Sequence, residues 1–292
     1  MTQPFFAKLK DAVARNNSLI CVGLDPDLSL MPVRNVAEFN IKIIEATSDL
    51  VCCYKPNLAF FEALGEEGWD ALRRTLEAIP EDIPVIADAK RGDIGNTAAA
   101  YAHAIFDVLG CDAATVNAYG GEDAVEPFLD YAEKGVLVWC RSSNPSAGEF
   151  QDLLVDYEGE RRPLWQVVAL KSMKWSKHDN AGIVVGATYP EQLAEARALA
   201  PTATILVPGV GAQDGSLRDS VLAGVTTAGE GIIVSASRSV IYASREGDYP
   251  MAARAAARLL QEQVNLYRRE RSFRFEQQAQ RSEQQTQRFS ED

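Results

Sequence analysis

The chain has 292 residues, of which 47% are hydrophobic and 24% charged. Its 41 Asp and Glu residues outnumber its 29 Lys and Arg residues, so the formal net charge is −12. These proportions are typical of a globular protein and exclude a disordered, collagen-like or disulfide-dominated chain. The acidic balance also argues against nucleic-acid binding, which depends on clustered basic side chains, so an anionic ligand needs a local positive site.

Eight short apolar runs recur along the chain and predict the strands of a parallel sheet. Each run is continuously apolar instead of alternating, which is typical of strands covered on both faces. The runs are residues 19–25, 51–57, 84–90, 113–119, 136–143, 182–188, 204–211 and 231–238.

Segments with helical spacing separate these runs, several of them ending on a Gly suited to a helix C-terminus. They are residues 35–50, 68–79, 96–110, 120–134, 189–200 and 214–229. Eight strand–helix units in series predict an α/β fold, a closed (β/α)8 TIM barrel formed by residues 1–265. The alternative is an open doubly wound sheet, but a dinucleotide-binding fold needs Gly-x-Gly-x-x-Gly after its first strand, and residues 22–29 contain one Gly.

Two segments depart from a minimal barrel. Residues 144–181 are longer than an ordinary loop and helix, and we expect an active-site loop followed by a helix over 164–175. Residues 144–160 are the candidate for a loop that closes over the site. Residues 266–292 are rich in Gln, Arg and Glu, which predicts a polar C-terminal extension, either helical or disordered.

The two histidines and five cysteines limit the chemistry and the compartment. His103 and His178 fit no metal-ligand spacing, so His-built zinc or triad chemistry is disfavoured. The cysteines form no Cys-x-x-Cys pair and lie in apolar runs, which favours free thiols in a reducing compartment. The sequence shows no signal-peptide core and no long apolar stretch, so we expect a cytoplasmic protein that does not span a membrane.

Charged residues gather where the second and third predicted strands end. Asp88 and Lys90 are two apart on a strand and leave on the same face, Asp93 follows in the turn, and Lys55 ends the neighbouring strand. Ligands of such barrels bind at the carboxyl ends of the strands. Because burying charges costs several kcal/mol each, four charges converging on an apolar interior indicate function.

A phosphate site is expected where the seventh and eighth strands end. Gly209 and Gly211 allow backbone N–H groups to approach an anion, Gln213 adds a neutral donor, and Arg238 supplies a bidentate guanidinium. Loops in this position form the usual phosphate site of (β/α)8 barrels.

The segment DAKRGDIGNT, residues 88–97, resembles the D-x-K-x-x-D-I-[G/P]-x-T signature of the orotidine 5′-phosphate decarboxylase family at every fixed position. The resemblance extends from about residue 22 to residue 240. It implies a (β/α)8 barrel and a homodimer with shared active sites. It also implies cofactor-independent decarboxylation of orotidine 5′-phosphate to UMP, without a metal.

The resemblance assigns a role to each candidate residue. It implies that Lys90 protonates C6 of the pyrimidine, that Asp88 lies beside the substrate carboxylate and that Lys55 orders the network and touches the ribose. Asp93 and Thr97 resemble residues delivered into the partner subunit's site. The expected substrate-binding residues are Asp25 for the ribose, Ser143 for the pyrimidine amide, with Ser142 as its alternative, and Gly209, Gly211, Gln213 and Arg238 for the phosphate.

Three other functions remain possible at this stage. Magnesium-dependent 3-keto-gulonate-6-phosphate decarboxylase and hexulose-6-phosphate synthase share the D-x-K-x-x-D segment, but they need an acidic ligand where this sequence has Lys55. A class I aldolase would use Lys90 or Lys55 as a Schiff base. A barrel that serves only as a binding module would leave the clustered charges without a purpose.

Overall fold

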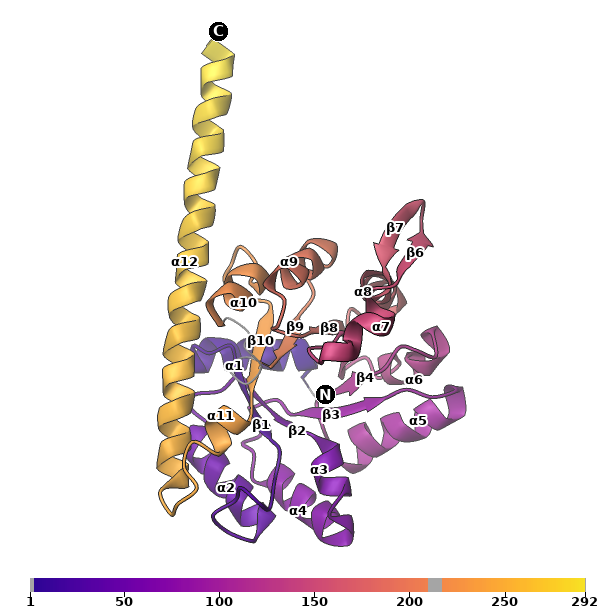
Figure 1. Cartoon of the computed structure of the whole chain (residues 1–292), viewed down its shortest axis with the longest axis vertical. Helices are drawn as coiled ribbons and strands as arrows, with labels where there is room; N and C mark the ends of the chain where they lie inside the picture. Colours follow the sequence, from indigo (N-terminus) through magenta and orange to yellow (C-terminus); the bar gives the residue numbers. More distant parts are fainter. Residues whose placement is uncertain (1–2, 210–216, 292) are drawn as a thin grey trace.

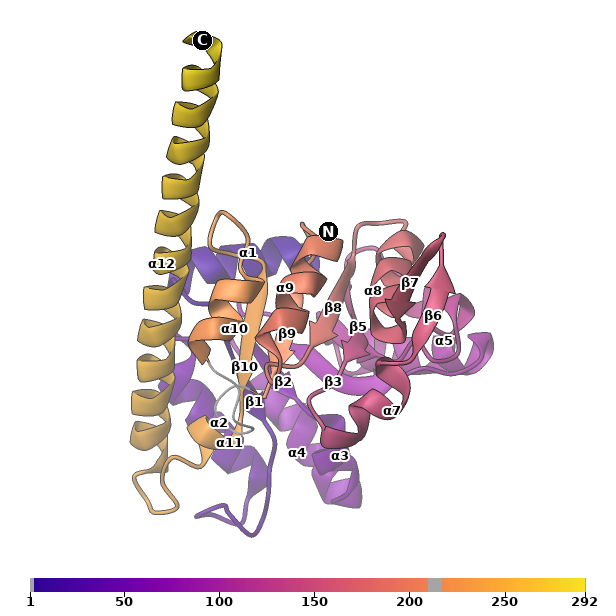
Figure 2. The same ribbon diagram turned by 45° about the horizontal axis from the view of Figure 1, so that its top comes forward.

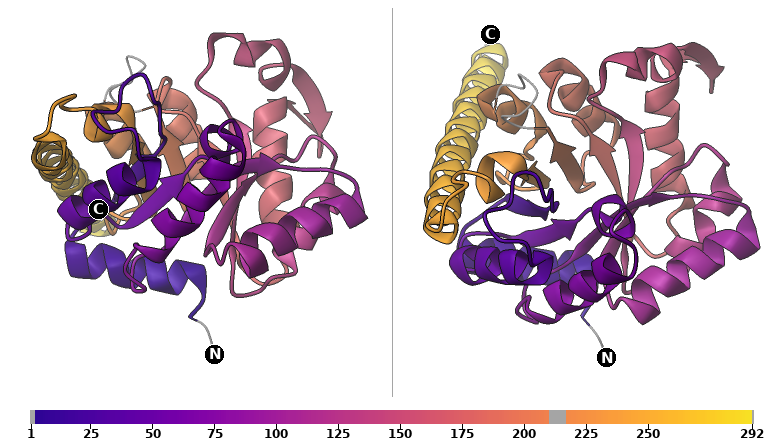
Figure 3. Two further views of the ribbon diagram at one scale, coloured as in Figure 1. Left: turned by 90° about the horizontal axis from the view of Figure 1, so that it is seen from below. Right: turned by 60° about the horizontal axis from the view of Figure 1, so that its bottom comes forward.

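The computed structural model describes residues 3–209 and 217–291, and side chains up to residue 273. Eight parallel strands form one sheet at the centre of the molecule, and helices surround it (Figures 1 and 3). The eight strands correspond to the eight predicted runs. They are β1 (Ile20–Leu24), β2 (Cys53–Pro56), β3 (Ile86–Arg91), β4 (Ala113–Val116), β5 (Gly135–Arg141), β8 (Ala181–Val185), β9 (Ile205–Pro208) and β10 (Ile232–Ala236).

The strand order is β2-β1-β10-β9-β8-β5-β4-β3, with every neighbouring pair parallel. Two parallel bridges, Tyr54 to Val85 and Asn57 to Asp88, join the first and last strands of this order. The sheet therefore closes into a (β/α)8 barrel, as the sequence predicts, and the carboxyl ends of all eight strands meet at one end.

Helices cover the outside of the barrel. They are α1 (Phe5–Asn16), α2 (Val36–Thr47), α3 (Leu58–Glu62), α4 (Gly65–Glu77), α5 (Gly95–His103), α6 (Glu126–Leu129), α7 (Gly148–Gln151), α8 (Leu164–Trp175), α9 (Pro190–Leu199), α10 (Leu217–Gly224), α11 (Arg238–Ile241) and α12 (Tyr249–Glu291). Short 3-10 turns lie at Glu122–Ala124 and Pro145–Ala147, and a π-helical turn follows α5 at Ala104–Val108. No helix in the described part of the chain is long and apolar enough to cross a membrane.

The segment 120–134 is more broken than its helical spacing predicts. It contains a 3-10 turn and the one-turn helix α6, with Pro127 in the first turn of α6. Proline lacks the N–H that would continue a preceding helix, so α6 begins anew at Glu126.

The long segment 144–181 contains the predicted helix, α8, with the predicted bounds, and also an antiparallel hairpin that the sequence analysis missed. Strands β6 (Leu154–Tyr157) and β7 (Glu160–Pro163) flank Glu158 and Gly159, whose φ angles are 53° and 83°. Two successive residues with positive φ are typical of the tight turns that join hairpins. The hairpin projects from the barrel next to α8 (Figure 1).

Helix α12 runs past residue 265 without a break and extends well beyond the barrel (Figure 2). Its first part packs on the barrel through buried residues such as Ala253, Ala257 and Val264. The contact continues beyond residue 265, because Glu270 accepts a hydrogen bond from Arg218 at 2.5 Å. The start of the polar extension is thus docked on the barrel, as part of the same helix.

Candidate active site

Two adjoining cavities lie at the carboxyl ends of the strands. The larger has a volume of about 450 Å³ and the smaller about 190 Å³. Both are lined by Lys55, Asp88, Ser143 and Pro208, so they form two lobes of one site. This is the end of the barrel at which the sequence predicts ligand binding.

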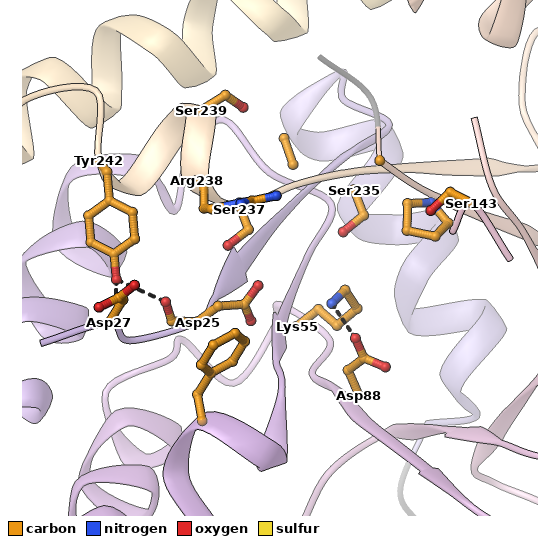
Figure 4. A pocket seen from close by; sticks show the side chains of 14 residues that line it. Asp25, Asp27, Lys55, Asp88, Ser143, Ser235, Ser237, Arg238, Ser239 and Tyr242 are labelled. Atoms are coloured by element: carbon orange, nitrogen blue, oxygen red, sulfur yellow. Dashed lines mark hydrogen bonds and ion pairs between the residues drawn. The ribbon is translucent and has the colours of Figure 1, made fainter. Parts of the chain in front are cut away.

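The large lobe lies between the ends of β1, β9 and β10 (Figure 4). Its remaining lining residues are Asp25, Asp27, Phe60, Gly209, Ser235, Ala236, Ser237, Arg238, Ser239 and Tyr242. The small lobe is lined by residues of β3, β4, β5, β8 and β9. Its remaining lining residues are Lys90, Thr115, Trp139, Ser142, Asn144, Val184 and Leu206.

Asp88 stands between two ammonium groups. Its Oδ2 lies 2.7 Å from Lys55 Nζ, and its Oδ1 lies 2.5 Å from Lys90 Nζ. Thr115 Oγ1 donates a third hydrogen bond to Oδ1, at 2.9 Å. Both carboxylate oxygens are therefore held by donors, which fixes the plane of the carboxylate and the position of both lysines.

The backbone at the end of β3 is irregular where this network forms. Lys90 has a φ of 48°, and the pairing of β3 with β4 shifts register between Ala87 and Arg91. A left-handed conformation is unfavourable for a non-glycine residue and clusters at functional sites. The N–H of Lys90 donates to Thr115 Oγ1 at 3.0 Å, so Thr115 holds both the strained backbone and the carboxylate.

Burial and charge oppose each other in this network. Burial by itself raises the pKa of Asp88, but the ammonium groups of Lys55 and Lys90 outweigh it and lower that pKa below its usual value. Burial likewise lowers the pKa of Lys55, and the carboxylates of Asp88 and Asp25 outweigh it and raise that pKa. Asp88 and Lys55 are thus both charged at neutral pH although both are buried.

The fourth predicted member, Asp93, does not join this cluster. Asp93 is exposed, and its Oδ1 accepts a hydrogen bond from the N–H of Ile94 at 2.7 Å. The chain turns away after Arg91, so the expectation of four converging buried charges is wrong for a single chain. Thr97, on the first turns of α5, is half-buried and lines neither lobe.

Arg238 and Gly209 line the large lobe, whereas Lys90 lines only the small lobe. The exposed Arg238 begins α11, and Gly209 follows β9 with a φ of 90°, a conformation open to glycine. Next to Arg238, the buried Ser237 Oγ has no hydrogen-bond partner in the described part of the chain. Gly211 and Gln213 lie outside the described residues. A guanidinium and an unpaired hydroxyl at one end of the lobe are suited to an anion.

Tyr242 holds the loop after β1 and was missed by the sequence analysis. Its hydroxyl donates to the carbonyl of Asp25 at 2.9 Å and accepts from the N–H of Asp27 at 2.6 Å. The side chain of Asp25 accepts the N–H of Asn57 at 3.3 Å. Tyr242 lies far along the chain from this loop, so local sequence patterns carry no signal for the contact.

Both candidate serines after β5 line the small lobe, and they differ in their hydrogen bonds. The Ser142 hydroxyl donates to Asn144 Oδ1, and Ser142 is buried. Ser143 lines both lobes, and its hydroxyl has no partner within residues 3–209 and 217–273. Ser143 is therefore the serine whose hydroxyl is available to a ligand.

Comparison with known proteins places the chain in a family. Residues 18–249 match the model of the orotidine 5′-phosphate decarboxylase / HUMPS family. An orotidine 5′-phosphate decarboxylase of Dehalococcoides mccartyi is 48% identical over 266 residues, which covers 91% of this chain and 98% of the relative. That of Thermomicrobium roseum is 47% identical over 273 residues, covering 91% and 96%.

Solved structures agree. The OMP decarboxylase of Leishmania donovani superposes with a TM-score of 0.81 at 40% identity, covering 91% of this chain and 99% of the other. The UMP synthase of the same organism gives a TM-score of 0.83 at 42% identity, and this chain covers 57% of its length. Fold and site together define a (β/α)8-barrel enzyme with a lysine–aspartate–lysine network in its small lobe and an arginine in its large lobe. The chain belongs to the orotidine 5′-phosphate decarboxylase / HUMPS family.

Proposed function

We propose that this protein decarboxylates orotidine 5′-phosphate to UMP, with Lys90 as the proton donor. The observation that carries the proposal is Asp88, held between Lys55 and Lys90 in the small lobe, with Arg238 across the large lobe. The chemistry calls for a fixed ammonium group at one end of the pocket and a phosphate-binding cation at the other. This chain covers nearly the whole length of the two relatives above, both of which are named orotidine 5′-phosphate decarboxylase.

The reaction breaks the bond between C6 of the pyrimidine and its carboxylate carbon, and the electron pair stays on C6. That pair lies in the ring plane and does not delocalise into the π system, so it must be stabilised by charge close to C6. A lysine ammonium fixed near C6 supplies this charge and then transfers a proton to C6 while carbon dioxide leaves. The hydrogen bond from Lys90 to Asp88 fixes that ammonium.

Asp88 has two roles in this proposal. It orients Lys90 through the 2.5 Å contact, and its charge lies beside the substrate carboxylate that departs as neutral carbon dioxide. Lys55 and Thr115 hold Asp88 ionised and in place. The proton that Lys90 loses is restored from solvent, since its side chain is 38% exposed.

The phosphate is bound at a distance from the reacting carbon. Arg238, Gly209 and the unpaired Ser237 hydroxyl supply donors there, and we assign Gly211 and Gln213 to the same end from the family resemblance. Contacts far from the reacting bond lower the chemical barrier when their binding energy holds the substrate in its reactive position. We assign Asp25, which lines the large lobe, to the ribose and Ser143, which lines both lobes, to the pyrimidine amide.

We further propose that two copies of the chain form a homodimer in which Asp93 and Thr97 complete the partner's site. Neither residue lines either lobe of its own pocket. Ile94 beside Asp93 and Tyr119 after β4 are 67% and 87% exposed, on loops that follow neighbouring strands. Large exposed apolar side chains on one end of a barrel favour burial against a second copy.

The buried state of the cysteines supports the expected reducing, cytoplasmic environment. Cys21, Cys52, Cys53, Cys111 and Cys140 are all free and buried. Burial raises the pKa of Cys111 and of Cys140 to about 12, which leaves them as inert thiols.

The decisive experiment follows the absorbance of orotidine 5′-phosphate after addition of protein dialysed against a chelator. Rapid loss of the orotate chromophore with release of one carbon dioxide per UMP is the expected result. A turnover that stops on chelation and returns with Mg²⁺ would favour the magnesium-dependent branch of the family. Inactivation by borohydride in the presence of substrate would instead favour a Schiff-base lysine.

A further inference from the structure

Arg141 is a buried cation outside the charge network described above. It is the last residue of β5, and its side chain is 4% exposed. A buried guanidinium is retained only where its donors find acceptors. Arg141 directly precedes Ser142 and Ser143, which line the small lobe. The contacts that fix Arg141 therefore also influence the position of these two serines.

The partners of Arg141 come from two elements outside the barrel wall. Its Nε donates to Gln192 Oε1 of α9 at 2.8 Å, and its guanidinium lies 5.4 Å from the ring centre of Tyr189. Its Nη1 donates to Gln151 Oε1 at 3.0 Å, and its Nη2 donates to Asp152 Oδ2 at 3.2 Å. Arg141 thereby ties α7 and α9 to the end of β5.

Gln151 connects this cluster to the small lobe. The same Oε1 that accepts from Arg141 also accepts the backbone N–H of Ser142 at 2.9 Å. That N–H lies past the last residue of β5, and Gln151 supplies its acceptor. The side chain of Gln151, at the end of α7, therefore fixes the direction in which the chain leaves the strand toward Ser143.

We propose that Gln151 is a positioning residue for the pyrimidine-binding turn Ser142–Ser143, held in place by the buried guanidinium of Arg141. The long segment after β5 then has a function of its own, since α7 supplies the acceptor that sets the wall of the small lobe. This inference rests on the proposed function. It extends that function by naming two residues, Gln151 and Arg141, that hold the pyrimidine-binding turn from behind.

The experiment compares two ligands that share the phosphate end and differ at the pyrimidine end. Binding of UMP and of ribose 5-phosphate is measured for the wild type, Gln151→Leu and Gln151→Glu, together with KM and kcat for orotidine 5′-phosphate. Gln166→Leu is the matched control, because Gln166 bonds to Glu195 on the exposed surface. Thermal unfolding of each variant is recorded alongside.

Gln151→Leu is expected to weaken UMP binding and raise KM about tenfold, with ribose 5-phosphate binding unchanged. Gln151→Glu retains both accepted hydrogen bonds and is expected to restore UMP binding to within about twofold of the wild type. If Gln151→Leu folds poorly, Arg141→Lys serves as the second variant, since a single ammonium cannot hold Gln151, Asp152 and Gln192 together.

An equal loss for both ligands, or no loss for either in a folded Gln151→Leu protein, would overturn the inference. A failure of Gln151→Glu to restore UMP binding would also overturn it. A wild-type protein that does not decarboxylate orotidine 5′-phosphate would overturn the proposed function itself, and that result is visible before any variant is prepared.

Discussion

The carboxylate of Asp88 accepts a hydrogen bond from Lys90 at 2.5 Å across a strand end at which Lys90 adopts a left-handed backbone. In a regular extended strand, the side chains of Asp88 and Lys90 would leave the backbone parallel to each other on the same face. The register shift in β3 bends the chain, so the ammonium group reaches the carboxylate. Strain at this point is offset by Thr115, which binds both partners.

Lys90→Ala is expected to reduce decarboxylation at least about 10³-fold, because the variant lacks both the charge near C6 and the proton donor. UMP binding, measured by calorimetry, should change far less, since Arg238 and Ser143 remain. Lys177→Ala is the matched control, as Lys177 pairs with Glu126 on the surface. Substantial turnover by the Lys90 variant would refute the assigned role.

Asp88→Asn should alter the acid limb of the stability curve. The folded-state pKa of Asp88 lies below its unfolded value near 3.8, so its ionised form stabilises the protein above that value and the contribution is lost as pH falls. Between pH 5 and pH 3 the wild type should lose about 1 kcal/mol more than the variant, measured by urea unfolding. Equal losses would show that Asp88 is not held ionised by its lysines.

Arg238→Ala should raise KM for orotidine 5′-phosphate, because the phosphate then lacks its guanidinium. Loss of a charged hydrogen-bonding pair predicts a decrease in kcat/KM of about 10- to 100-fold. The decrease should disappear with orotidine, the nucleoside without phosphate. Arg258→Ala on the exposed side of α12 is the control, and a similar decrease with orotidine would contradict phosphate recognition.

Tyr242→Phe removes the hydroxyl that joins Asp25 and Asp27 while keeping the ring stacked on Phe39 at 5.6 Å. Two backbone groups then lose their partner, so we expect a loss of about 1–2 kcal/mol in the free energy of unfolding. KM should rise with little change in kcat, because Asp25 binds substrate and takes no part in proton transfer. An unchanged KM would show that Tyr242 does not position Asp25 for substrate binding.

Mixing inactive Asp93→Ala and Lys90→Ala proteins tests whether Asp93 acts across an interface. A mixed dimer contains one site with both residues intact, so random exchange should restore about a quarter of wild-type activity. Size-exclusion chromatography with differently tagged subunits verifies that mixed dimers form. Persistent inactivity of verified mixed dimers would confine Asp93 to its own subunit.

The linear pattern alone was enough to predict the barrel and the convergence of three charged residues at one of its ends. Eight continuously apolar runs specify strands buried on both faces, and their order permits few topologies. The residues that end those runs, Lys55, Asp88 and Lys90, converge because parallel strands end at the same edge. The segment 88–97 carried the family resemblance that the comparisons confirm.

Only the tertiary structure decided which groups meet. Asp93 leaves the cluster because the chain turns after β3, and Tyr242 reaches Asp25 from more than two hundred residues away. Gln151 reaches Ser142 because a short helix folds back on its own strand. Hydrophobic periodicity specifies which face is buried, whereas such polar contacts depend on backbone direction after each strand, which periodicity does not encode.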